Sequence, residues 1–433
     1  MEFTLKRMNL NKGASLDLIS PLFLRICSDL LAEPLSMIFN KSINDCVFPD
    51  QWKLCHVIPI FKSGKKVDVR NYRGVTIELT LAKVFEMLVD QQLKLNVNHL
   101  LSKSQHGFLP NRNIETNLTE LSVRAVEAFE AGKQIDIFYA DIQKAFDTVD
   151  QSLLIRKMAK FPISNKTLRW FASYFKNRKQ VVRVNSSVSD TFEVPSSVGQ
   201  GTILGPLLFL IFFDDFDMNI GSTVALNFAD DKKLLRIVSN NNDAVELQRS
   251  IDNFMVWCSN NALQVKIAKC KILTLTHRRN PIKFDYYVNG SKVYRVDEIR
   301  DLGVMIDSKL SFATHIEYMK KKSMAMLSFV KRNCRQKFEL DSAKLLYGSL
   351  VRSNLEFAST VWLPHHKSYK VSVESVQKQA VIYLNGDYLN RGGNENNYVL
   401  KPYVERCNAL ELTTLVRRRI SGFIHPQNHQ WKI

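Results

Sequence analysis

Two acidic positions, each at the end of a strand-like apolar run, most constrain how this chain can fold. The run IDIFYA at Ile135–Ala140 is followed by Asp141, and two short apolar runs within residues 225–238 flank the pair Asp230-Asp231. Short apolar runs of this kind are typical of buried strands, and the second pattern predicts a hairpin. Carboxylates beside buried strands need hydrogen bonds or a cation. We therefore expect hydrogen-bond donors or cations beside these carboxylates.

Metal binding is one explanation of these carboxylates. Two adjacent carboxylates repel each other unless a cation lies between them, and hard divalent ions such as Mg²⁺ prefer oxygen ligands. Two ions held in this way can activate an attacking hydroxyl and stabilise a leaving oxygen in phosphoryl transfer. Asp-Asp pairs are also ordinary in turns, so the residues alone leave a structural alternative open.

The rest of the chain mixes helical and strand patterns in its first part and is mostly helical in its last part. Helical periodicity covers residues 16–44, 82–97, 116–130, 153–160, 166–176 and 244–262. Strand patterns cover residues 56–61, 135–140, 180–184, 191–194 and 271–276, and Asn289-Gly290 predicts a tight hairpin within 286–294. After Leu302 the pattern is mostly helical and basic. The fold class is therefore α+β, with an N-terminal helical extension over 1–50, a mixed region over 51–307 and a basic helical region over 308–433.

The charge balance indicates a polyanionic partner. The chain has 60 Lys and Arg against 42 acidic residues, a formal net charge of +18. Nucleic acid is the first interpretation, an anionic membrane surface the second, and a solvated cationic face the structural alternative. Seven Cys without a CxxC motif indicate neither a zinc site nor a disulfide framework. With no signal segment and no apolar run longer than Pro206–Phe213, we expect an intracellular protein without a membrane span.

An ordered series of sequence motifs runs along the chain. The first blocks are PDQWKLCHVIPIFKSGKK, NYRGVTIELTLAKVFE and QHGFLPNRN. The central blocks are YADIQKAFDTVD, SVGQGTILGPLLF and FADD. The later blocks are WCSNNALQVKIAKCKIL, DLGVMID, LSFATHI, LVRSNLEFASTVW and RRRI. In this order, the motifs resemble those of the reverse transcriptases of non-LTR, LINE-like retrotransposons of the jockey type. The resemblance covers nearly the whole chain.

The resemblance implies a right-hand polymerase fold, with fingers and palm over residues 51–307 and a helical thumb and C-terminal region over 308–433. It implies an RNA-directed DNA polymerase that adds deoxynucleotides to a primer 3′-OH on an RNA template, with a DNA primer and deoxynucleoside triphosphates as partners. By match to the family motifs, Asp141 and Asp230 would bind two Mg²⁺ ions, for which Mn²⁺ can substitute, and Asp231 would assist. The family also makes the nucleus a plausible location, while the sequence leaves the oligomeric state open.

Further matches imply nucleotide-binding residues. These are Arg73, Lys62, Phe146, Gln200, Gly201 and Lys269. Phe146 matches the aromatic residue that excludes a 2′-hydroxyl, Arg73 the arginine that grips the triphosphate, and Lys269 a lysine that helps to protonate pyrophosphate. Core packing is the structural alternative for Phe146, solvation for Lys62 and a simple turn for Gly201.

Basic residues imply contacts with nucleic acid. Arg112 survives in the QHGF block, and a cationic cluster falls where the family has its thumb. The members of that cluster are Lys320, Lys321, Lys322, Lys331, Arg332 and Arg335. A thumb holds duplexes of changing sequence, so we expect these side chains to contact phosphates rather than bases.

Several residues depart from the family pattern. They are Gly74, Leu109, Asn111, Ser197, Gly199 and Lys266. Gly199 stands where the family has Pro, which loosens the backbone of that loop. Together these changes indicate drift in an element copy, which disfavours efficient catalysis. Only about fifty residues precede the fingers motif, too few for an endonuclease domain, so we expect a truncated element copy or a fragment of a longer reading frame. A catalytically weak nucleic-acid-binding remnant and an RNA-dependent RNA polymerase are the alternative functions.

Overall fold

The computed structural model describes the chain except residues 11–14, 16, 335–337, 387–401 and 425–433. The described residues form two compact units. The first comprises 1–113, 137–272 and 282–294, and the second comprises 114–136, 273–281 and 295–433. Residues 114–136 thus group with the later part of the chain, although they precede the Asp141 motif in the sequence.

Three helices open the first unit: α1 (Glu2–Lys6), α2 (Pro21–Ile26) and α3 (Ser28–Asp45). The predicted helix over 16–44 is confirmed from residue 21 onward. Ser20 caps α2 by accepting a hydrogen bond from the backbone N–H of Leu22, and Pro21 occupies the first turn, where a missing N–H is harmless. The α3 ring of Phe39 stacks on Phe85, with 4.4 Å between ring centroids.

A first sheet has the strand order β2-β1-β4-β5, with β6 also paired to β4. Its strands are β1 (Leu54–Phe61), β2 (Tyr72–Ile77), β4 (Lys179–Val184), β5 (Ser187–Val188) and β6 (Phe192–Glu193). β1 pairs antiparallel with β2 and parallel with β4. The helices α4 (Thr80–Val97), α6 (Gln151–Met158) and α7 (Asn165–Phe175) belong to the same unit. Phe48, Trp170 and Tyr174 form an aromatic cluster at its core.

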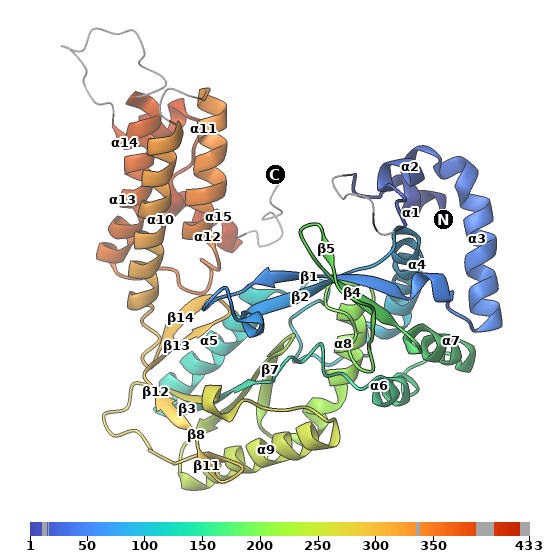
Figure 1. Cartoon of the computed structure of the whole chain (residues 1–433). Coiled ribbons are helices and arrows are strands. Elements are labelled where there is room, and N and C mark those ends of the chain that lie inside the picture. The colour runs from blue at the N-terminus through green and yellow to red at the C-terminus, as the bar shows by residue number, and fades with distance from the viewer. Residues whose placement is uncertain (11–14, 16, 335–337, 387–401, 425–433) are drawn as a thin grey trace. The chain divides into compact units, whose positions relative to one another are not determined.

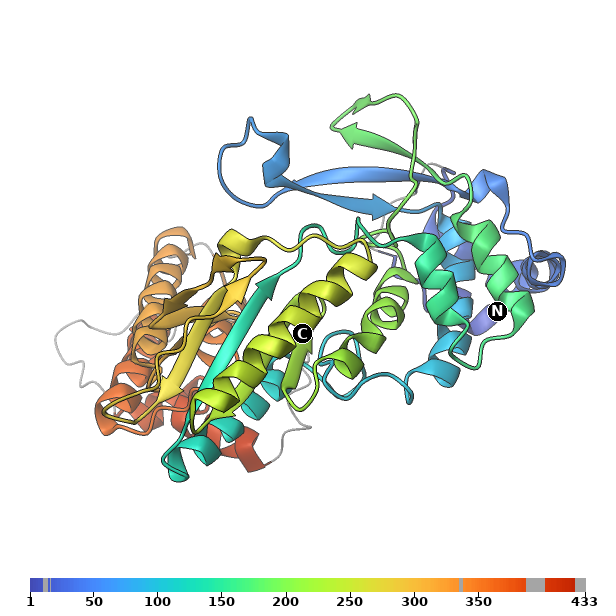
Figure 2. The same ribbon diagram turned by 90° about the horizontal axis from the view of Figure 1, so that it is seen from below.

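The second sheet carries both acidic motifs and has the order β12-β9-β3-β8-β7. Its strands are β3 (Gln134–Asp141), β7 (Val224–Phe228), β8 (Asp231–Val238), β9 (Lys271–Thr276) and β12 (Tyr294–Val296). The predicted buried strand and the predicted hairpin are both confirmed. Helix α9 (Asn241–Asn260) packs on β8, as Figure 2 shows.

Two local signals in the sequence are confirmed by backbone geometry. Asn289 and Gly290 have φ values of 47° and 75° between β10 (Tyr287–Val288) and β11 (Ser291–Lys292), as a two-residue hairpin of this type requires. The apolar run at residues 206–213 forms α8 (Gly205–Phe213), which is buried on nearly every side within the first unit. None of the described helices combines the length and apolarity needed to cross a membrane.

The second unit is mainly helical, as predicted. It contains α5 (Ile114–Glu130) and a hairpin of β13 (Glu298–Asp301) and β14 (Val304–Asp307). Its later helices are α10 (Ala313–Cys334), α11 (Leu340–Leu346), the π-helical turn η5 (Tyr347–Arg352), α12 (Ser353–Glu356), α13 (Lys367–Leu384), α14 (Tyr403–Ala409) and α15 (Leu415–Ile424). α10 packs against α13 and η5 (Figure 1). Together the two units confirm the α+β class.

Candidate active site

The acidic residues lie on neighbouring strands of the second sheet. Asp141 is the last residue of β3 and Asp231 is the first residue of β8, and β3 and β8 are hydrogen-bonded neighbours. The side chain of Asp141 is 38% exposed, and its Oδ2 lies 3.3 Å from the Nζ of Lys269. The ammonium of Lys269 therefore supplies positive charge to a carboxylate at the end of a buried strand, which needs such compensation.

The hairpin between β7 and β8 has a two-residue turn made by Ala229 and Asp230. Phe228 pairs with Asp231 across the hairpin, so the turn is tight. Ala229 adopts a left-handed φ of 53°, which is unusual for a residue other than glycine, and Asp230 is half-buried. The turn thus presents two successive carboxylates from a strained backbone.

A buried cation lies directly behind this turn. Lys232 is only 2% exposed, and its Nζ has no hydrogen-bond partner among the described residues, although it lies 4.6 Å from the centre of the Phe213 ring. Burial lowers the pKa of Lys232 to about 8, and Asp217 and Asp230 oppose that shift by favouring the charged form. The positive charge of Lys232 therefore offsets part of the repulsion within the acidic turn.

Two buried thiols, those of Cys258 and Cys270, are influenced electrostatically by charged residues of the acidic region. Burial raises the pKa of the Cys270 thiol, and the negative charge of Asp141 raises it further. Burial likewise raises the pKa of Cys258 to about 12, and both Lys232 and Cys270 act on this thiol. The thiols therefore stay protonated at neutral pH and are poor metal ligands. The remaining donors, the aspartate oxygens, are those that hard divalent cations prefer.

The donor chemistry thus fits magnesium better than a soft metal. In the described part of the chain, no three His, Cys, Asp or Glu side chains gather closely enough to enclose a metal ion. Asp141, Asp230 and Asp231 nevertheless supply only oxygen, and two of them occupy the ends of adjacent strands. Their role as metal ligands stays a prediction.

Arg73 on β2 lies within electrostatic range of the segment that follows Asp141. The pKa of Asp147 is raised by burial, and the positive charges of Lys144 and Arg73 oppose part of this rise. Arg73 is exposed and stands opposite Ile60 in the register of β1 and β2. Lys62 follows β1 directly, and its side chain is exposed. Both cations are available to a bound anion, and their role with nucleotides stays a prediction.

The loop at residues 197–201 lies against β2. The backbone N–H of Thr76 donates to the carbonyl of Gln200 at 2.7 Å. Gly201 has a φ of 108°, and a Cβ there would lie 2.8 Å from the carbonyl oxygen of Thr76. The missing side chain at Gly201 therefore allows the loop to approach the backbone of β2 closely. Gly199 has a φ of 67°, which proline cannot adopt, so this loop could not take the family's proline without changing its backbone.

Phe146 packs between two other aromatic residues. Its ring stacks on Phe209 of α8 at 4.1 Å and meets Phe108 edge-on at 6.2 Å. Its backbone carbonyl accepts a hydrogen bond from the N–H of Val198, which joins it to the loop at residues 197–201. Phe146 is partly buried by these contacts. The packing supports a structural role, and discrimination against a 2′-hydroxyl stays a prediction.

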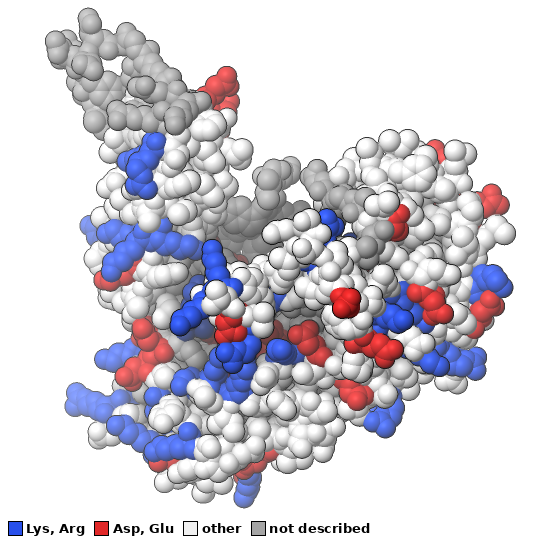
Figure 3. Space-filling model, viewed as in Figure 1, with Lys and Arg blue, Asp and Glu red and all other residues white. Residues whose placement is uncertain are grey.

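The basic residues expected to contact nucleic acid differ in their surroundings. Arg112 donates hydrogen bonds to the carbonyls of Lys103 and Gln105, so its guanidinium holds the segment before it. In the second unit, Lys331 lies 5.7 Å from the ring centre of Tyr383 and Arg332 is exposed. Of the other expected residues, Lys321 pairs with Glu317 at 3.9 Å, Lys320 is half-buried, Lys322 is exposed, and Arg335 lies outside the described residues. Figure 3 shows cations interspersed with anions on the face viewed.

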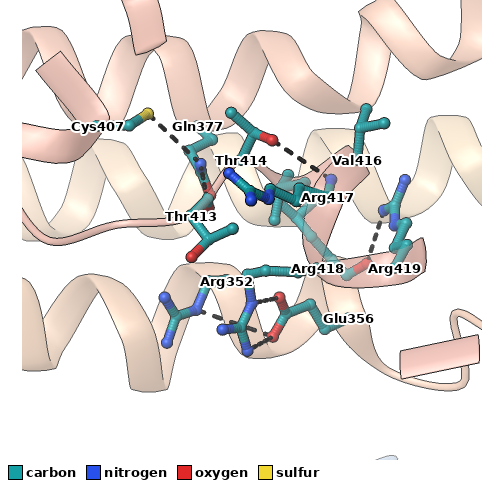
Figure 4. A network of polar contacts seen from close by, with 12 residues as sticks. Arg352, Glu356, Gln377, Cys407, Thr413, Thr414, Val416, Arg417, Arg418 and Arg419 are labelled. Atoms are coloured by element: carbon teal, nitrogen blue, oxygen red, sulfur yellow. Dashed lines mark hydrogen bonds and ion pairs between the residues drawn. The ribbon is translucent and has the colours of Figure 1, made fainter. Parts of the chain in front are cut away.

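The late RRRI motif belongs partly to the interior of the second unit (Figure 4). Arg418 pairs with Glu356, which Arg352 also approaches at 3.8 Å. Arg419 donates to the carbonyl of Leu355 at 3.0 Å. These contacts join α15 to α12, so two arginines of the motif stabilise the packing of the second unit.

The sequence did not predict a buried polar cluster that lies near the loop at residues 197–201. Glu86 accepts hydrogen bonds from the hydroxyl of Tyr174 at 2.6 Å and from the backbone N–H of Leu204 at 3.1 Å. Arg178 lies 3.5 Å from Glu78, and burial together with Glu86 raises the pKa of Glu78 well above its usual value. A glutamate on the apolar face of α4 was the available signal, but nothing in the sequence identified its partners.

Comparison with known proteins identifies the family. The model described as "Reverse transcriptase (RNA-dependent DNA polymerase)" matches residues 62–306, more than half of the chain. The "RNA-directed DNA polymerase from mobile element jockey" of Drosophila melanogaster is 26% identical over 395 residues, which are 88% of this chain and 43% of that protein. The "Probable RNA-directed DNA polymerase from transposon BS" of the same organism is 24% identical over 409 residues, 89% of this chain and 45% of that protein.

Among solved structures, the chain resembles the apo telomerase of Candida tropicalis with a TM-score of 0.45 and 12% identity, over 82% of this chain and 63% of the telomerase. The chain belongs to the reverse transcriptase (RNA-dependent DNA polymerase) family. The resemblance to polymerases of non-LTR retrotransposons is confirmed by the jockey and BS relatives, and the right-hand α+β fold by the family match. The chain spans less than half the length of these curated relatives.

Proposed function

We propose that this chain is the polymerase part of a non-LTR retrotransposon protein and copies RNA into DNA. The observation that carries the proposal is the arrangement of the acidic motifs within a reverse transcriptase domain, where Asp141 ends β3 and Asp231 begins the neighbouring strand β8. Its substrates are deoxynucleoside triphosphates, added to the 3′-OH of a DNA primer on an RNA template. The proposed location is intracellular, and the family makes the nucleus one candidate compartment beside the cytoplasm.

The metal ligands in this proposal are Asp141, Asp230 and Asp231. Reverse transcriptases generally use divalent metal ions, and two Mg²⁺ ions, or Mn²⁺ in their place, suit these oxygen donors. When bound, the ions activate the primer hydroxyl and neutralise charge on the leaving pyrophosphate. In this proposal the ammonium of Lys269, which pairs with Asp141, donates a proton to that pyrophosphate.

The chain's other residues bind and orient the nucleotide. Arg73 and Lys62 supply positive charge on and beside the first sheet, where a triphosphate needs it. Phe146, five residues after Asp141, contacts the sugar of the nucleotide in this proposal. Gln200 and Gly201 belong to the loop that lies against β2, and in this proposal they contact the nucleotide. The net charge of +18 suits the phosphate backbones of template and primer. Arg112 and the cations of α10 contribute to this binding.

A weak or inactive remnant is the competing function. Its support is the loop at residues 197–201, where Ser197 has a φ of 99° in a position that is Gly in the family. A backbone strained in this way stores free energy that a glycine would release. Nucleic-acid binding without turnover would then be the surviving activity.

Primer extension on purified protein tests both functions. The assay uses an RNA template, a DNA primer and deoxynucleotides with Mg²⁺, and compares the parent with Asp230→Asn and Asp190→Asn. Asp190 is exposed on the loop between β5 and β6, so its replacement is the matched loss of one negative charge. We expect extension by the parent and Asp190→Asn, no extension by Asp230→Asn, and similar primer-template affinity for all three, because phosphate contacts with Lys and Arg dominate affinity. An inactive parent that binds nucleic acid would establish the remnant, and an active Asp230→Asn would refute the metal site.

A further inference from the structure

The QHGF segment lies beside the acidic hairpin and is joined to it by an isolated β-bridge. Gln105 pairs with Asn227 of β7 in a parallel bridge. The N–H of Asn227 donates to the carbonyl of Ser104 at 2.9 Å, and the N–H of His106 donates to the carbonyl of Asn227 at 2.8 Å. The segment thus lies along β7 just before the turn that carries Asp230.

The side chain of Gln105 reaches the turn itself. Gln105 is 6% exposed, and its Oε1 accepts hydrogen bonds from the N–H of Gly107 at 2.9 Å and from the N–H of Ala229 at 3.1 Å. Ala229 is the residue with the left-handed φ that directly precedes Asp230. One buried oxygen therefore satisfies a backbone donor of a strained turn, and an unsatisfied donor there would favour a different turn conformation.

Gly107 makes this contact possible. A Cβ at residue 107 would lie 2.7 Å from the backbone nitrogen of Ala229 and 3.3 Å from the carbonyl carbon of Phe228. Any side chain at this position would push the turn away from the QHGF segment. The glycine of the motif is thus explained by the closeness of two backbones rather than by its own turn.

The segment is anchored from behind as well. The hydroxyls of Ser102 and Ser104 both donate to Asp217, and the side-chain amide of Asn227 donates to the same carboxylate at 3.2 Å. The backbone N–H of Ser102 donates to Asp214 at 2.7 Å. Both aspartates belong to the 3₁₀ helix η3 (Asp214–Asn219). The segment and β7 are therefore fixed to a common support in the first unit.

We propose that Gln105 is a positioning residue for the catalytic hairpin: its Oε1 holds the Ala229 N–H and thereby sets the orientation of Asp230. This proposal rests on the proposed function, because it takes Asp230 as a metal ligand. Gln105 itself contacts neither metal nor substrate in this role. Losing its oxygen should displace the Asp230 carboxylate, and small displacements of reacting groups reduce turnover strongly.

The test compares three variants with the parent. Gln105→Leu keeps the size of the side chain but removes the acceptor, and Gln105→Glu restores an acceptor oxygen. Gln377→Leu is the matched control, because Gln377 is 0% exposed and its side chain forms buried hydrogen bonds with Tyr347 and Tyr403 in the second unit. Both leucine variants remove a buried amide, but only one of them touches the acidic hairpin.

The first measurement is amide hydrogen exchange in the peptide covering residues 226–232. We expect exchange at this peptide to rise at least tenfold in Gln105→Leu, and to stay near the parent rate in Gln105→Glu and Gln377→Leu. Unchanged exchange in Gln105→Leu would overturn the contact. The same rise in Gln377→Leu would show that the effect on this peptide does not come from the Gln105 contact, and would overturn the proposal.

The second measurement separates positioning from general damage. Under the proposal, kcat in primer extension falls about 10- to 100-fold in Gln105→Leu, the Mg²⁺ concentration for half-maximal rate rises, and primer-template affinity is unchanged. Gln105→Glu recovers most of the kcat, and Gln377→Leu needs no additional Mg²⁺. A Gln105→Leu variant with the parent's kcat and Mg²⁺ dependence would refute the proposal.

A third readout does not depend on activity. Mn²⁺ binding, followed by electron paramagnetic resonance, should be weaker in Gln105→Leu than in the parent and in Gln377→Leu. If the parent extends no primers, the proposed function fails, and the Mn²⁺ titration still decides the role of Gln105. Equal Mn²⁺ affinity in the parent and Gln105→Leu would then overturn the positioning role by itself.

Discussion

Replacing Gly201 by alanine should detach the loop at residues 197–201 from β2. An L-residue in the left-handed region costs about 1–2 kcal/mol, and the φ of Gly201 is 108°. The new Cβ would also lie 2.8 Å from the carbonyl oxygen of Thr76, a backbone atom that cannot rotate away. Moving the loop to relieve this clash breaks the 2.7 Å hydrogen bond from Thr76 to Gln200, which contributes about 1 kcal/mol. Because alanine also restricts the unfolded chain, which returns about 0.4–1 kcal/mol, we expect the free energy of unfolding to fall by about 2 kcal/mol in total.

Gly221→Ala is the matched control for this change. Gly221 also has a positive φ, 63°, but a Cβ there would meet nothing within 4 Å. We expect the free energy of unfolding to fall by only about 1 kcal/mol, because the alanine also restricts the unfolded chain. Denaturant unfolding measures both values, and the deoxynucleotide KM of Gly201→Ala should rise while that of Gly221→Ala stays constant. Equal decreases in stability in the two variants would refute the importance of the close approach to Thr76.

Three further substitutions test the nucleotide site, the basic surface and a buried histidine. Phe146→Val should raise ribonucleotide incorporation relative to deoxynucleotides in single-nucleotide extension, because the smaller side chain relieves a clash with the 2′-hydroxyl; unchanged selectivity in an active variant would leave Phe146 with only its packing role on Phe209. Neutralising Lys331 and Arg332 should weaken binding about equally for two unrelated duplexes and flatten the salt dependence by roughly one unit of slope for each phosphate that these side chains neutralise; an unchanged slope would exclude them from the interface. Burial lowers the pKa of His315 to about 4 from an ordinary value near 6.5, so on acidification the unfolded chain binds a proton before the folded chain does. The free energy of unfolding should therefore fall by about 2 kcal/mol between pH 7 and pH 5. An equal fall in a His315→Asn variant would show that His315 is not the group responsible.

The sequence by itself determined the local elements and the identity of the acidic residues. The mainly apolar run before Asp141 forms a strand that is buried along nearly its whole length, as short apolar runs of this kind predict. Asn289-Gly290 closes a hairpin, because both positions require positive φ and these residue types accept it. The predicted helix over 116–130 ends before Gly132, whose φ of 63° suits glycine. These features depend on short stretches of chain, so short-range patterns predicted them.

Tertiary structure decided how the polar residues are used. Gln105 and Ala229 are far apart in sequence, and their hydrogen bond exists because the QHGF segment lies along β7. Arg418 stands in a run of three arginines, and only the packing of α15 pairs it with Glu356. Lys232 follows two aspartates in the sequence, and the sheet buries it behind the acidic turn. Burial and partners of a charged side chain depend on which elements become neighbours, and residue type alone does not specify that.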